Sequence, residues 1–498
     1  MATTLKLYDT YSRQLLEFPP ADSPARENPG TPVTYYTCGP TVYNYAHIGN
    51  FRAYIFEDQV VRTLEYFGWK VRQVMNLTDV DDKTILGANP DRVEVPADEM
   101  RRRLDAYTAP YIQAFFEDID ALNIKRAAVY PRATEHVAEM VRLIGALAAN
   151  GYAYEGDDGS WYFAIKKFPR YGLLSGIELG DVRVGARVSS DEYEKEDARD
   201  FALWKKARPG EPIWDPKEYD PASPLPVGRP GWHIECSAMS QKHLGETLDV
   251  HSGGHDNIFP HHENEIAQSE GASGKKFVRH WLHCGYLVVD GEKMSKSKGN
   301  YFTLRDVLAR GHNPLAVRLL LESTHYRKPL NFTFEGLAGA ETNLKQLQAF
   351  LRRLDREAEA AADSAKGRGE AGKAIRKAKE SFAAALADDL NISAALAAVF
   401  EMLGTVNRML DEGRVGRDEI DPAREALLGF DTVLGLRLGR ETTGAKVDAA
   451  FVEDRLARRA EAKGARDFAR ADAIRDELAA LGVVVEDTPQ GTKWHLAE

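Results

Sequence analysis

Side chains suited to a metal ion are concentrated in residues 259–268, FPHHENEIAQ. Two histidines and two glutamates fall within five positions there, at His261, His262, Glu263 and Glu265. The pattern His-Glu-x-x-His on one helical turn would indicate a zinc protease. Ile266 stands where the second histidine would have to be, so the protease ligand set is incomplete. His261 and Glu265 are four residues apart, and on a helix they would share one face.

Two cysteines elsewhere in the chain could complete a metal site with that pair. Cys38 ends a strand-like run, and Cys236 lies in GWHIECSAM. Thiolate, imidazole and carboxylate groups are all good zinc ligands. Taken one at a time, these residues are more simply interpreted as buried apolar thiols and as polar residues of a solvated helix. The residues alone leave the ligand set open, because further donors are present at His251, His255, His262 and Cys284.

The motif HIGN, residues 47–50, falls where a predicted strand gives way to a predicted helix. His47 can donate a hydrogen bond to a phosphate oxygen there, and the free amides of a helix N-terminus favour the same anion. Gly49 has no side chain, so a flat base could approach the backbone closely. A His-x-Gly sequence at a helix start is common in plain structure, so this motif alone is a weak signal.

The motif KMSKS, residues 293–297, follows an Asp290-Gly291 pair that predicts a tight turn between apolar runs. Lys293 and Lys296 could fold onto a polyphosphate, and a mobile loop would let them close only around the leaving group. Taken alone, this loop would be interpreted as a solvated basic segment.

The first third of the chain predicts the α/β fold that would position these motifs. Residues 33–39 predict a strand, residues 51–69 a helix and residues 70–79 a second strand. This order forms the βαβ unit of a parallel sheet, whose ligands bind beyond the carboxyl ends of the strands. CGPTVYNYAHIGN lies at that edge. After an irregular, Pro- and Gly-rich stretch, strand-like sequence returns at ETLDVHSGG and HWLHCGYLVV.

Composition limits the class of protein. A chain of 498 residues should hold more than one domain. Three cysteines exclude a disulfide framework, and reduced thiols without an apolar signal core predict a cytoplasmic protein. No stretch is apolar enough to span a membrane. The formal net charge of −11 argues against nonspecific coating of nucleic acid, although a local basic patch could still meet a specific RNA.

HIGN and KMSKS together resemble the two signatures of class I aminoacyl-tRNA synthetases. In that family both signatures bind ATP while an amino-acid carboxylate attacks the α-phosphate. The usual first signature ends in a second histidine; Asn50 replaces it here and can donate a hydrogen bond but carries no charge. CGPTVYNYAHIGN, NLTDVDDK, GWHIECSAM, FPHHENEIAQ and DGEKMSKSKGN each resemble segments of the cysteinyl-tRNA synthetase family, in the same order. The closing FARADAIRDELAALGVVVEDTPQGTKW is similar to that family's C-terminal end, so the resemblance runs nearly end to end.

The resemblance implies an ATP-dependent cysteine–tRNA ligase. L-cysteine and ATP would give cysteinyl-adenylate and pyrophosphate, and the cysteinyl group would then pass to the 3′-terminal ribose of tRNA(Cys). The implied ligands of one Zn²⁺ per chain are Cys38, Cys236, His261 and Glu265, while His262 and Glu263 would point elsewhere. Zinc would favour the thiolate of cysteine over the hydroxyl of serine, so no editing domain would be needed.

The other site residues also follow from the resemblance. The implied catalytic residues are His47, Asn50, Lys293 and Lys296, and Gly49 and Ser295 would join them in binding ATP with Mg²⁺. Thr78 and Trp232 would line the amino-acid pocket. An RNA-facing surface is predicted from arginines near the C-terminus: Arg455, Arg458, Arg459, Arg466, Arg470 and Arg475.

The implied architecture starts with a Rossmann-like parallel-sheet catalytic domain at residues 1–335. It would contain an insertion at about 110–230 and a stem-contact region at about 300–335. An α-helical anticodon-binding domain would follow at 336–445 and a small C-terminal RNA-binding unit at 446–498. We expect a monomer that does not associate with membranes.

Two other functions stay open at this point. A cysteine ligase of the mycothiol pathway shares the adenylate chemistry but acts on a small amino-sugar, and the long stretch beyond residue 335 argues against it. A non-catalytic zinc protein that binds RNA or a nucleotide would show no cysteine-dependent exchange between pyrophosphate and ATP.

Overall fold

The computed structural model describes residues 4–28, 30–177, 200–360, 369–439, 449–464, 467, 470–472, 474–475, 478, 483–488 and 491–496. The chain divides into two compact units, Met1–Leu436 and Arg437–Glu498. The candidate metal ligands and both phosphate-binding motifs belong to the first unit.

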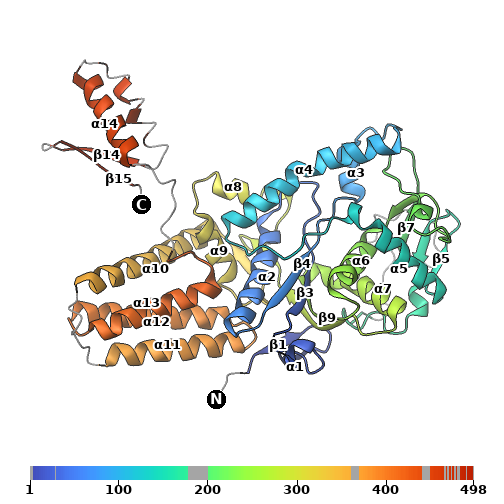
Figure 1. Cartoon of the computed structure of the whole chain (residues 1–498), viewed down its shortest axis with the longest axis horizontal. Coiled ribbons are helices and arrows are strands. Elements are labelled where there is room, and N and C mark those ends of the chain that lie inside the picture. Colours follow the sequence, from blue (N-terminus) through green and yellow to red (C-terminus); the bar gives the residue numbers. More distant parts are fainter. Residues whose placement is uncertain are drawn as a thin grey trace. The chain divides into compact units, whose positions relative to one another are not determined.

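A parallel sheet with the strand order β10–β9–β3–β4 lies at the centre of the first unit (Figure 1). Its strands are β3 (Val33–Thr37), β4 (Val71–Met75), β9 (Leu248–Gly254) and β10 (Val278–Cys284). Most of their residues are buried, as expected where helices cover both faces of a parallel sheet. The predicted α/β fold with a parallel sheet is therefore confirmed.

Helix α2 (Ile48–Tyr66) crosses from β3 to β4 and confirms the predicted βαβ unit. Phe51 and Ile55 are fully buried on it, as expected for a helix that packs on the sheet. The helix starts three residues earlier than its predicted start at residue 51, because the side chain of His47 caps it. The βαβ unit thus brings HIGN to the carboxyl edge of the sheet.

The hairpin predicted before KMSKS is also present. Strand β11 (Leu287–Val289) pairs antiparallel with β12 (Glu292–Lys293) and parallel with β13 (Leu330–Phe332). Asp290 and Gly291 occupy the turn with φ of 50° and 78°, the left-handed region that glycine adopts without strain.

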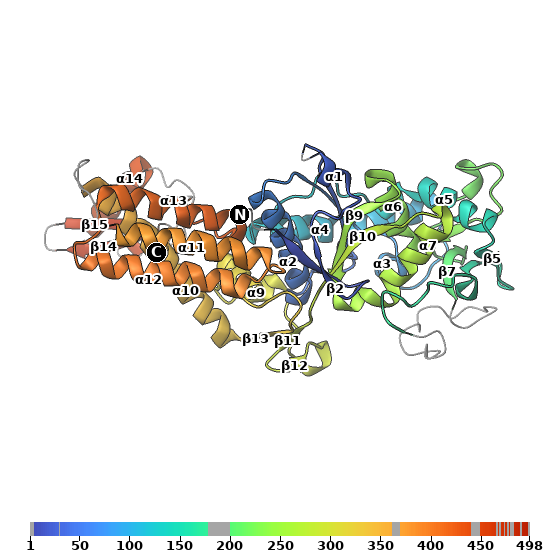
Figure 2. The same ribbon diagram turned by 90° about the horizontal axis from the view of Figure 1, so that it is seen from below.

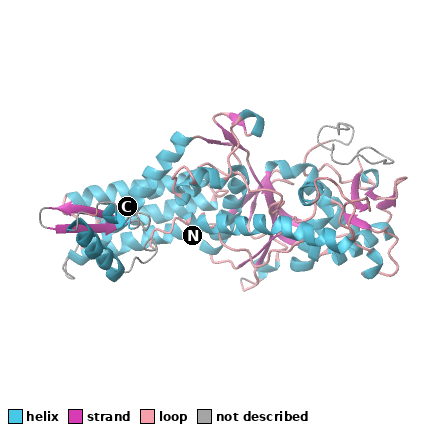
Figure 3. Cartoon of the chain, turned by 90° about the horizontal axis from the view of Figure 1, so that it is seen from above, coloured by secondary structure: helices cyan, strands magenta, loops and turns pink. Residues whose placement is uncertain are grey.

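A long segment between β4 and β9 adds a second, antiparallel sheet with the order β5–β6–β7–β8. Its strands are β5 (Ala153–Glu155), β6 (Trp161–Phe163), β7 (Phe201–Lys206) and β8 (Gly228–Pro230). The helices of this segment are α3 (Asp82–Ala88), α4 (Ala97–Ala121), α5 (Val137–Ala149) and α6 (Trp232–Leu244). Helix α7 (Glu263–Ser273) follows β9 and packs on α5 and α6. Figure 3 draws the strands of both sheets in magenta.

Shorter elements complete the sheet region of the first unit. The N-terminal pieces are the hairpin β1 (Lys6–Asp9) and β2 (Gln14–Glu17) and the helical turn α1 (Pro24–Glu27). Helices α8 (Leu304–Leu308) and α9 (Pro314–Glu322) follow the KMSKS loop. Short 3₁₀ turns lie at Ala133–Glu135, Ile165–Lys167, Pro216–Glu218, His255–Asn257 and Lys296–Lys298.

The rest of the first unit is helical, as the sequence predicts. Helices α10 (Phe334–Ala360), α11 (Glu370–Ala387), α12 (Ile392–Asp411) and α13 (Arg417–Leu434) lie side by side (Figure 2). The second unit contains α14 (Ala449–Gly464) and a hairpin of β14 (Val483–Thr488) and β15 (Gly491–Leu496). No described helix combines the length and apolar content that a membrane crossing needs.

Candidate metal centre and nucleotide site

The four predicted metal ligands come together from three separate parts of the first unit. Cys38 directly follows β3, and Cys236 lies on α6. The chain from β9 reaches α7 through a wider helical turn, Ile258–His262, which contains His261, and Glu265 lies in the first turn of α7. One ligand atom from each of the four lies within 4.8 Å of the ligand atoms of the others.

The contacts inside this cluster are those of a compact donor set. His261 Nε2 lies 3.0 Å from Glu265 Oε1, and Cys38 Sγ lies 3.9 Å from the same oxygen. Cys236, His261 and Glu265 are buried, while Cys38 is half-buried. Sulfur, nitrogen and oxygen donors at this spacing suit zinc.

A second donor set overlaps the first. Cys38 and Glu265 also lie within 4.8 Å of ligand atoms of His251 and His262. His262 Nε2 is 3.3 Å from Cys38 Sγ, so the prediction that His262 points elsewhere is wrong. Residues three apart on a helix are neighbours as well as residues four apart, which brings His262 to the same face as Glu265. Glu263 does point away, where it accepts hydrogen bonds from the amides of Gly172 and Ser175.

The electrostatics of the cluster favour a cation. A hydrogen bond from Cys38 lowers the pKa of Cys236 to about 6, whereas burial raises the pKa of Cys38. Burial opposes ionisation of Glu265, but the charges of His251 and His261 outweigh it and lower its pKa to about 2. Burial would lower the pKa of His261, but the charges of Glu265 and Cys236 outweigh it and raise that pKa to about 10. A protonated imidazole thus accompanies these buried anions, and a divalent metal ion would replace its proton. The residues present therefore fit a metal ion.

The two residues predicted for the amino-acid pocket lie beside this cluster. The Trp232 ring stacks on His261 with centroids 4.5 Å apart, and the side chain is 45% exposed. Thr78 is buried, and its backbone bonds to Pro40 and Val42, just after Cys38. Trp232 therefore offers an accessible aromatic face next to the candidate metal ligands.

HIGN forms a capping box at the start of α2. Asn50 N donates to His47 Nδ1 at 3.1 Å, and His47 N donates to Asn50 Oδ1 at 3.0 Å. Because Nδ1 of His47 accepts, the proton of the neutral ring is on Nε2 and is available to a ligand. Burial lowers the pKa of His47 and so favours this neutral form. A side chain at Gly49 would press on the His47 ring and on Met294.

The structure joins HIGN to the KMSKS loop. Ile48 N donates to Phe302 O at 3.0 Å, and the His47 ring contacts the Tyr301 ring at 5.4 Å. The ammonium of Lys296 lies 5.1 Å from the centre of the same Tyr301 ring. Both motifs therefore share one surface, as a nucleotide bound between them would require.

The lysines of the loop are placed for an anion. Lys293 and Lys296 are exposed, and neither belongs to an ion pair among the described residues. Lys298, in contrast, pairs with Glu292 at 2.9 Å. Ser295 is held by the side chains of Asn300 and Ser297, which fixes the loop backbone rather than a ligand.

Sequence reasoning missed two histidines that contact the metal cluster. His233 Nδ1 lies 2.9 Å from His261 Nδ1, and His283 Nε2 lies 2.8 Å from His262 Nδ1. The only local signal was that His233 directly follows Trp232 in a motif already singled out. His283 lies on β10, and only the strand order places it next to β9 and α7.

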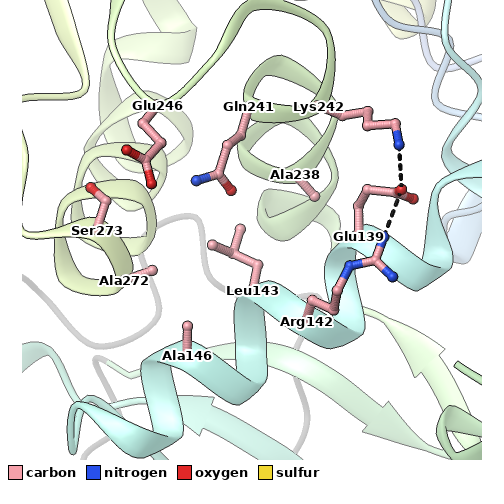
Figure 4. Close-up of a pocket in the computed structure, with 10 residues that line it drawn as sticks. All are labelled: Glu139, Arg142, Leu143, Ala146, Ala238, Gln241, Lys242, Glu246, Ala272 and Ser273. Carbon is pink, nitrogen blue, oxygen red and sulfur yellow. Dashed lines mark hydrogen bonds and ion pairs between the residues drawn. The ribbon is translucent and has the colours of Figure 1, made fainter. Parts of the chain in front are cut away.

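A cavity of about 450 Å³ lies on another side of α6, between α5 and the end of α7 (Figure 4). Glu139 bridges Arg142 and Lys242 at its rim, with distances of 2.8 and 3.2 Å. None of the predicted ligands or phosphate-binding residues lines it. The cavity is therefore separate from the candidate site.

The fold agrees with solved structures of one class of enzyme. Methionyl-tRNA synthetase of Mycobacterium tuberculosis in complex with methionyl-adenylate matches with a TM-score of 0.57 and 17% identity, covering 82% of this chain and 90% of that chain. A LeuRS–tRNA–LeuAMS complex of Agrobacterium radiobacter K84 matches with a TM-score of 0.56 and 12% identity, covering 84% of each chain. At these identities the likeness shows the fold alone, which is that of a class I aminoacyl-tRNA synthetase.

Sequence comparison narrows the class to one family. The model described as tRNA synthetases class I (C) catalytic domain matches residues 26–342, and the Cysteinyl-tRNA ligase anticodon binding domain matches residues 450–494, with a DALR domain at 381–439 between them. The cysteine--tRNA ligase of Protochlamydia amoebophila is 46% identical over 98% of this chain and 97% of its own length. That of Solibacter usitatus is 45% identical over 98% and 99%. The chain belongs to the cysteine–tRNA ligase family.

Proposed function

We propose that this chain is a cysteine–tRNA ligase. It activates L-cysteine with ATP to cysteinyl-adenylate and pyrophosphate, then transfers the cysteinyl group to the 3′-terminal ribose of tRNA(Cys). The observation that carries the proposal is a largely buried donor cluster with two thiols at the sheet edge that also holds HIGN, which in turn contacts the segment after KMSKS. The family membership of nearly the whole chain supports it.

The metal ion of this proposal is Zn²⁺, one per chain, held by Cys38, Cys236, His261 and Glu265. When bound, zinc supplies a Lewis acid that prefers a thiolate to a neutral hydroxyl, which separates cysteine from serine. The protein contributes the lowered pKa of Cys236 and the ionised carboxylate of Glu265, both of which favour binding of a divalent cation. Trp232 and Thr78 border the space in which the amino acid would bind.

ATP, with Mg²⁺, would bind between HIGN and the KMSKS loop. His47 donates from Nε2 to a phosphate oxygen, and Gly49 lets the adenine approach the backbone. The ammonium groups of Lys293 and Lys296 neutralise charge that develops on the leaving pyrophosphate. Asn50 and Ser295 hold the two motifs in shape through the capping box and the loop hydrogen bonds.

The further partners follow from the family. tRNA(Cys) would bind the helical residues 336–445 and the C-terminal unit 446–498. Of the arginines predicted to face RNA, Arg466 lies outside the described residues, and Arg455, Arg458, Arg470 and Arg475 lie on partly or fully exposed positions while Arg459 is buried. A cytoplasmic monomer remains part of the proposal.

Cysteine-dependent exchange between pyrophosphate and ATP tests the first step. We expect exchange with the wild-type chain, and loss of at least about 100-fold in Lys296→Ala, since removal of one charge-stabilising donor typically costs about that much. Lys298→Ala is the matched control, because this lysine pairs with Glu292 and should leave exchange unchanged. Absence of cysteine-dependent exchange in the wild type would favour a non-catalytic protein and contradict the proposal.

A mixed assay separates the ligase from a cysteine ligase of the mycothiol pathway. Cysteine transfer to tRNA(Cys) supports the proposal, while transfer to the amino-sugar acceptor alone would contradict it. The match to a cysteinyl-tRNA ligase anticodon binding domain at residues 450–494 favours the tRNA.

A further inference from the structure

A group of tyrosines lies next to the HIGN motif. Tyr43 and Tyr45 lie in the loop between β3 and α2, just before HIGN, and Tyr107 and Tyr111 face them from α4. The Tyr45 and Tyr111 rings are 5.4 Å apart, as are the Tyr107 and Tyr111 rings, in edge-to-face pairs. We call these four residues the tyrosine cluster. Tyr107 and Tyr111 belong to helix α4, which contacts α3 and α8 (Figure 1).

A hydrogen bond and a close packing contact fix the position of Tyr107 in the cluster. The Tyr107 hydroxyl donates to Tyr43 O at 2.8 Å, which fixes α4 against the loop. Gly87 on α3 makes room for the Tyr107 ring, since a Cβ there would overlap the ring atoms. Because Tyr107 is fixed in this way, α4 holds Tyr111 beside Tyr45. The position of α4 therefore does not depend on the rings of Tyr45 and Tyr111.

Cations flank the rings on both sides. The ammonium of Lys83 lies 4.8 Å from the centre of the Tyr43 ring, and the guanidinium of Arg305 lies 5.2 Å from that of Tyr45. Arg305 is anchored by Glu117 and Asp118 at 2.6 and 3.2 Å, whereas no ion pair among the described residues includes Lys83. A further pair of ring and cation lies at the KMSKS loop, where the Lys296 ammonium is 5.1 Å from the centre of the Tyr301 ring.

The accessible rings suggest a ligand with flat faces. Tyr45 is 42% exposed, so part of its side chain is accessible to a ligand. In an edge-to-face pair, the two rings leave part of their faces uncovered by each other. Aromatic faces interleaved with basic side chains are the surface that single-stranded nucleic acid recognises, because bases stack on rings and phosphates meet cations.

Building on the proposed function, we infer that the tyrosine cluster binds the unpaired 3′ end of the tRNA, with a base stacked on the exposed ring of Tyr45, which the edge-to-face contact with Tyr111 holds in place. The accepting ribose must reach the adenylate between HIGN and KMSKS, and Tyr45 lies only two residues before His47. A chain with a net charge of −11 attracts RNA weakly as a whole, so local binding groups at this opening are needed. Lys83 would meet a phosphate beside the stacked base, while Arg305, which pairs with Glu117 and Asp118, would hold the Tyr45 ring.

Steady-state kinetics of Tyr45→Ala and Tyr111→Ala test the inference. We expect the KM for tRNA in cysteinylation to rise about 5- to 150-fold, which is the range for loss of one stacked base. Cysteine-dependent pyrophosphate exchange and the KM for ATP should stay within about twofold of the wild type, because that step needs no tRNA. Tyr45→Phe and Tyr111→Phe keep the ring and should retain the wild-type KM for tRNA.

A shortened RNA identifies the contact. The tRNA(Cys) transcript trimmed of its unpaired 3′ nucleotides should bind the wild type and Tyr45→Ala with equal affinity, whereas the full transcript should bind Tyr45→Ala more weakly. An unchanged KM for tRNA in both alanine variants would overturn the inference. A raised KM for ATP would instead assign the rings to adenine and would equally overturn it. Failure of the proposed function itself would be seen separately, as absence of exchange in the wild type.

Discussion

Glu322 is expected to keep its proton at neutral pH, and its replacement by glutamine tests this. Glu322 ends α9 and is fully buried, as are Asp58 and Arg318 around it. Arg318 Nη2 lies 2.7 Å from Asp58 but 3.5 Å from Glu322. Asp58 also takes Arg62 at 2.7 Å and the amide of Lys125 at 2.9 Å. Asp58 therefore has both guanidinium groups, and Glu322 is left with the weaker contact.

The pKa values follow from this unequal sharing. Burial would raise the pKa of Asp58, but the charges of Arg318 and Arg62 outweigh it and lower that pKa. For Glu322, burial dominates and raises the pKa from 4.5 to about 8. Between these values the folded chain binds a proton that the unfolded chain has lost. The carboxyl therefore contributes stability that is fully present below pH 4.5 and is lost as the pH rises through about 8.

The magnitude follows from linkage. Uptake of one proton on folding lowers the free energy of unfolding by about 1.4 kcal/mol per pH unit across this window, or about 5 kcal/mol in all. Glu322→Gln resembles the protonated acid and removes this dependence. We expect the stability of Glu322→Gln relative to wild type to rise by about 1.4 kcal/mol per unit between pH 5 and 7.5. Urea unfolding followed by tryptophan fluorescence at several pH values measures the difference.

Asp58→Asn is the matched control in the same cluster. Its carboxylate has a lowered pKa, so its stabilising effect is present at neutral pH and disappears only in acid. Asp58→Asn should therefore be destabilised by about 3–5 kcal/mol at pH 7, the usual effect of breaking a buried ion pair. A pH-independent difference between Glu322→Gln and wild type would refute the reasoning, since it would mean that Glu322 is already ionised at pH 5.

Three further predictions concern the site. Cys236→Ser should lose most of the bound zinc by metal analysis, whereas Glu263→Gln should retain it, because Glu263 bonds backbone amides away from the cluster; full retention in Cys236→Ser would favour the donor set without it. Gly39→Ala should lower the thermal midpoint by an amount equivalent to about 1–3 kcal/mol, since its Cβ would collide with Asn76 O; an unchanged midpoint would contradict the tight approach. Asn50→Ala should lose about 1 kcal/mol of stability with the cap, while Asn50→Asp keeps the cap but weakens ATP binding by charge repulsion; a wild-type KM for ATP in Asn50→Asp would place the phosphates elsewhere.

Local patterns in the sequence predicted the elements that hold the site. The alternation from strand to helix to strand around α2 gave the βαβ unit, and Asp290-Gly291 gave the hairpin, because both depend on residues close in sequence. The predicted start of α2 was wrong because the helix is capped by His47, whereas the residues usually found at an N-cap are Ser, Thr, Asp and Asn.

The composition of the metal cluster could not be derived from such patterns. Cys38 and Glu265 are 227 positions apart, and only the strand order of the sheet decides which donors meet. His251 and His262 satisfy the same distance criterion as Cys236 and His261, so spacing in sequence leaves both sets open. The choice between them rests on the family resemblance and on the metal analysis of Cys236→Ser.

The role of Asn50 becomes clear once the helix cap is considered together with the charge of His47. A second histidine at this position would offer charge to a phosphate, and asparagine does not. In this chain, however, burial keeps His47 neutral, and the capping box leaves its Nε2 proton free for the ligand. HIGN then contributes directed hydrogen bonds, while the positive charge comes from the exposed lysines of the KMSKS loop. Asn50 preserves the cap that orients the ring of His47. The lack of charge on Asn50 therefore has little effect on the hydrogen bonds that HIGN offers to the phosphates.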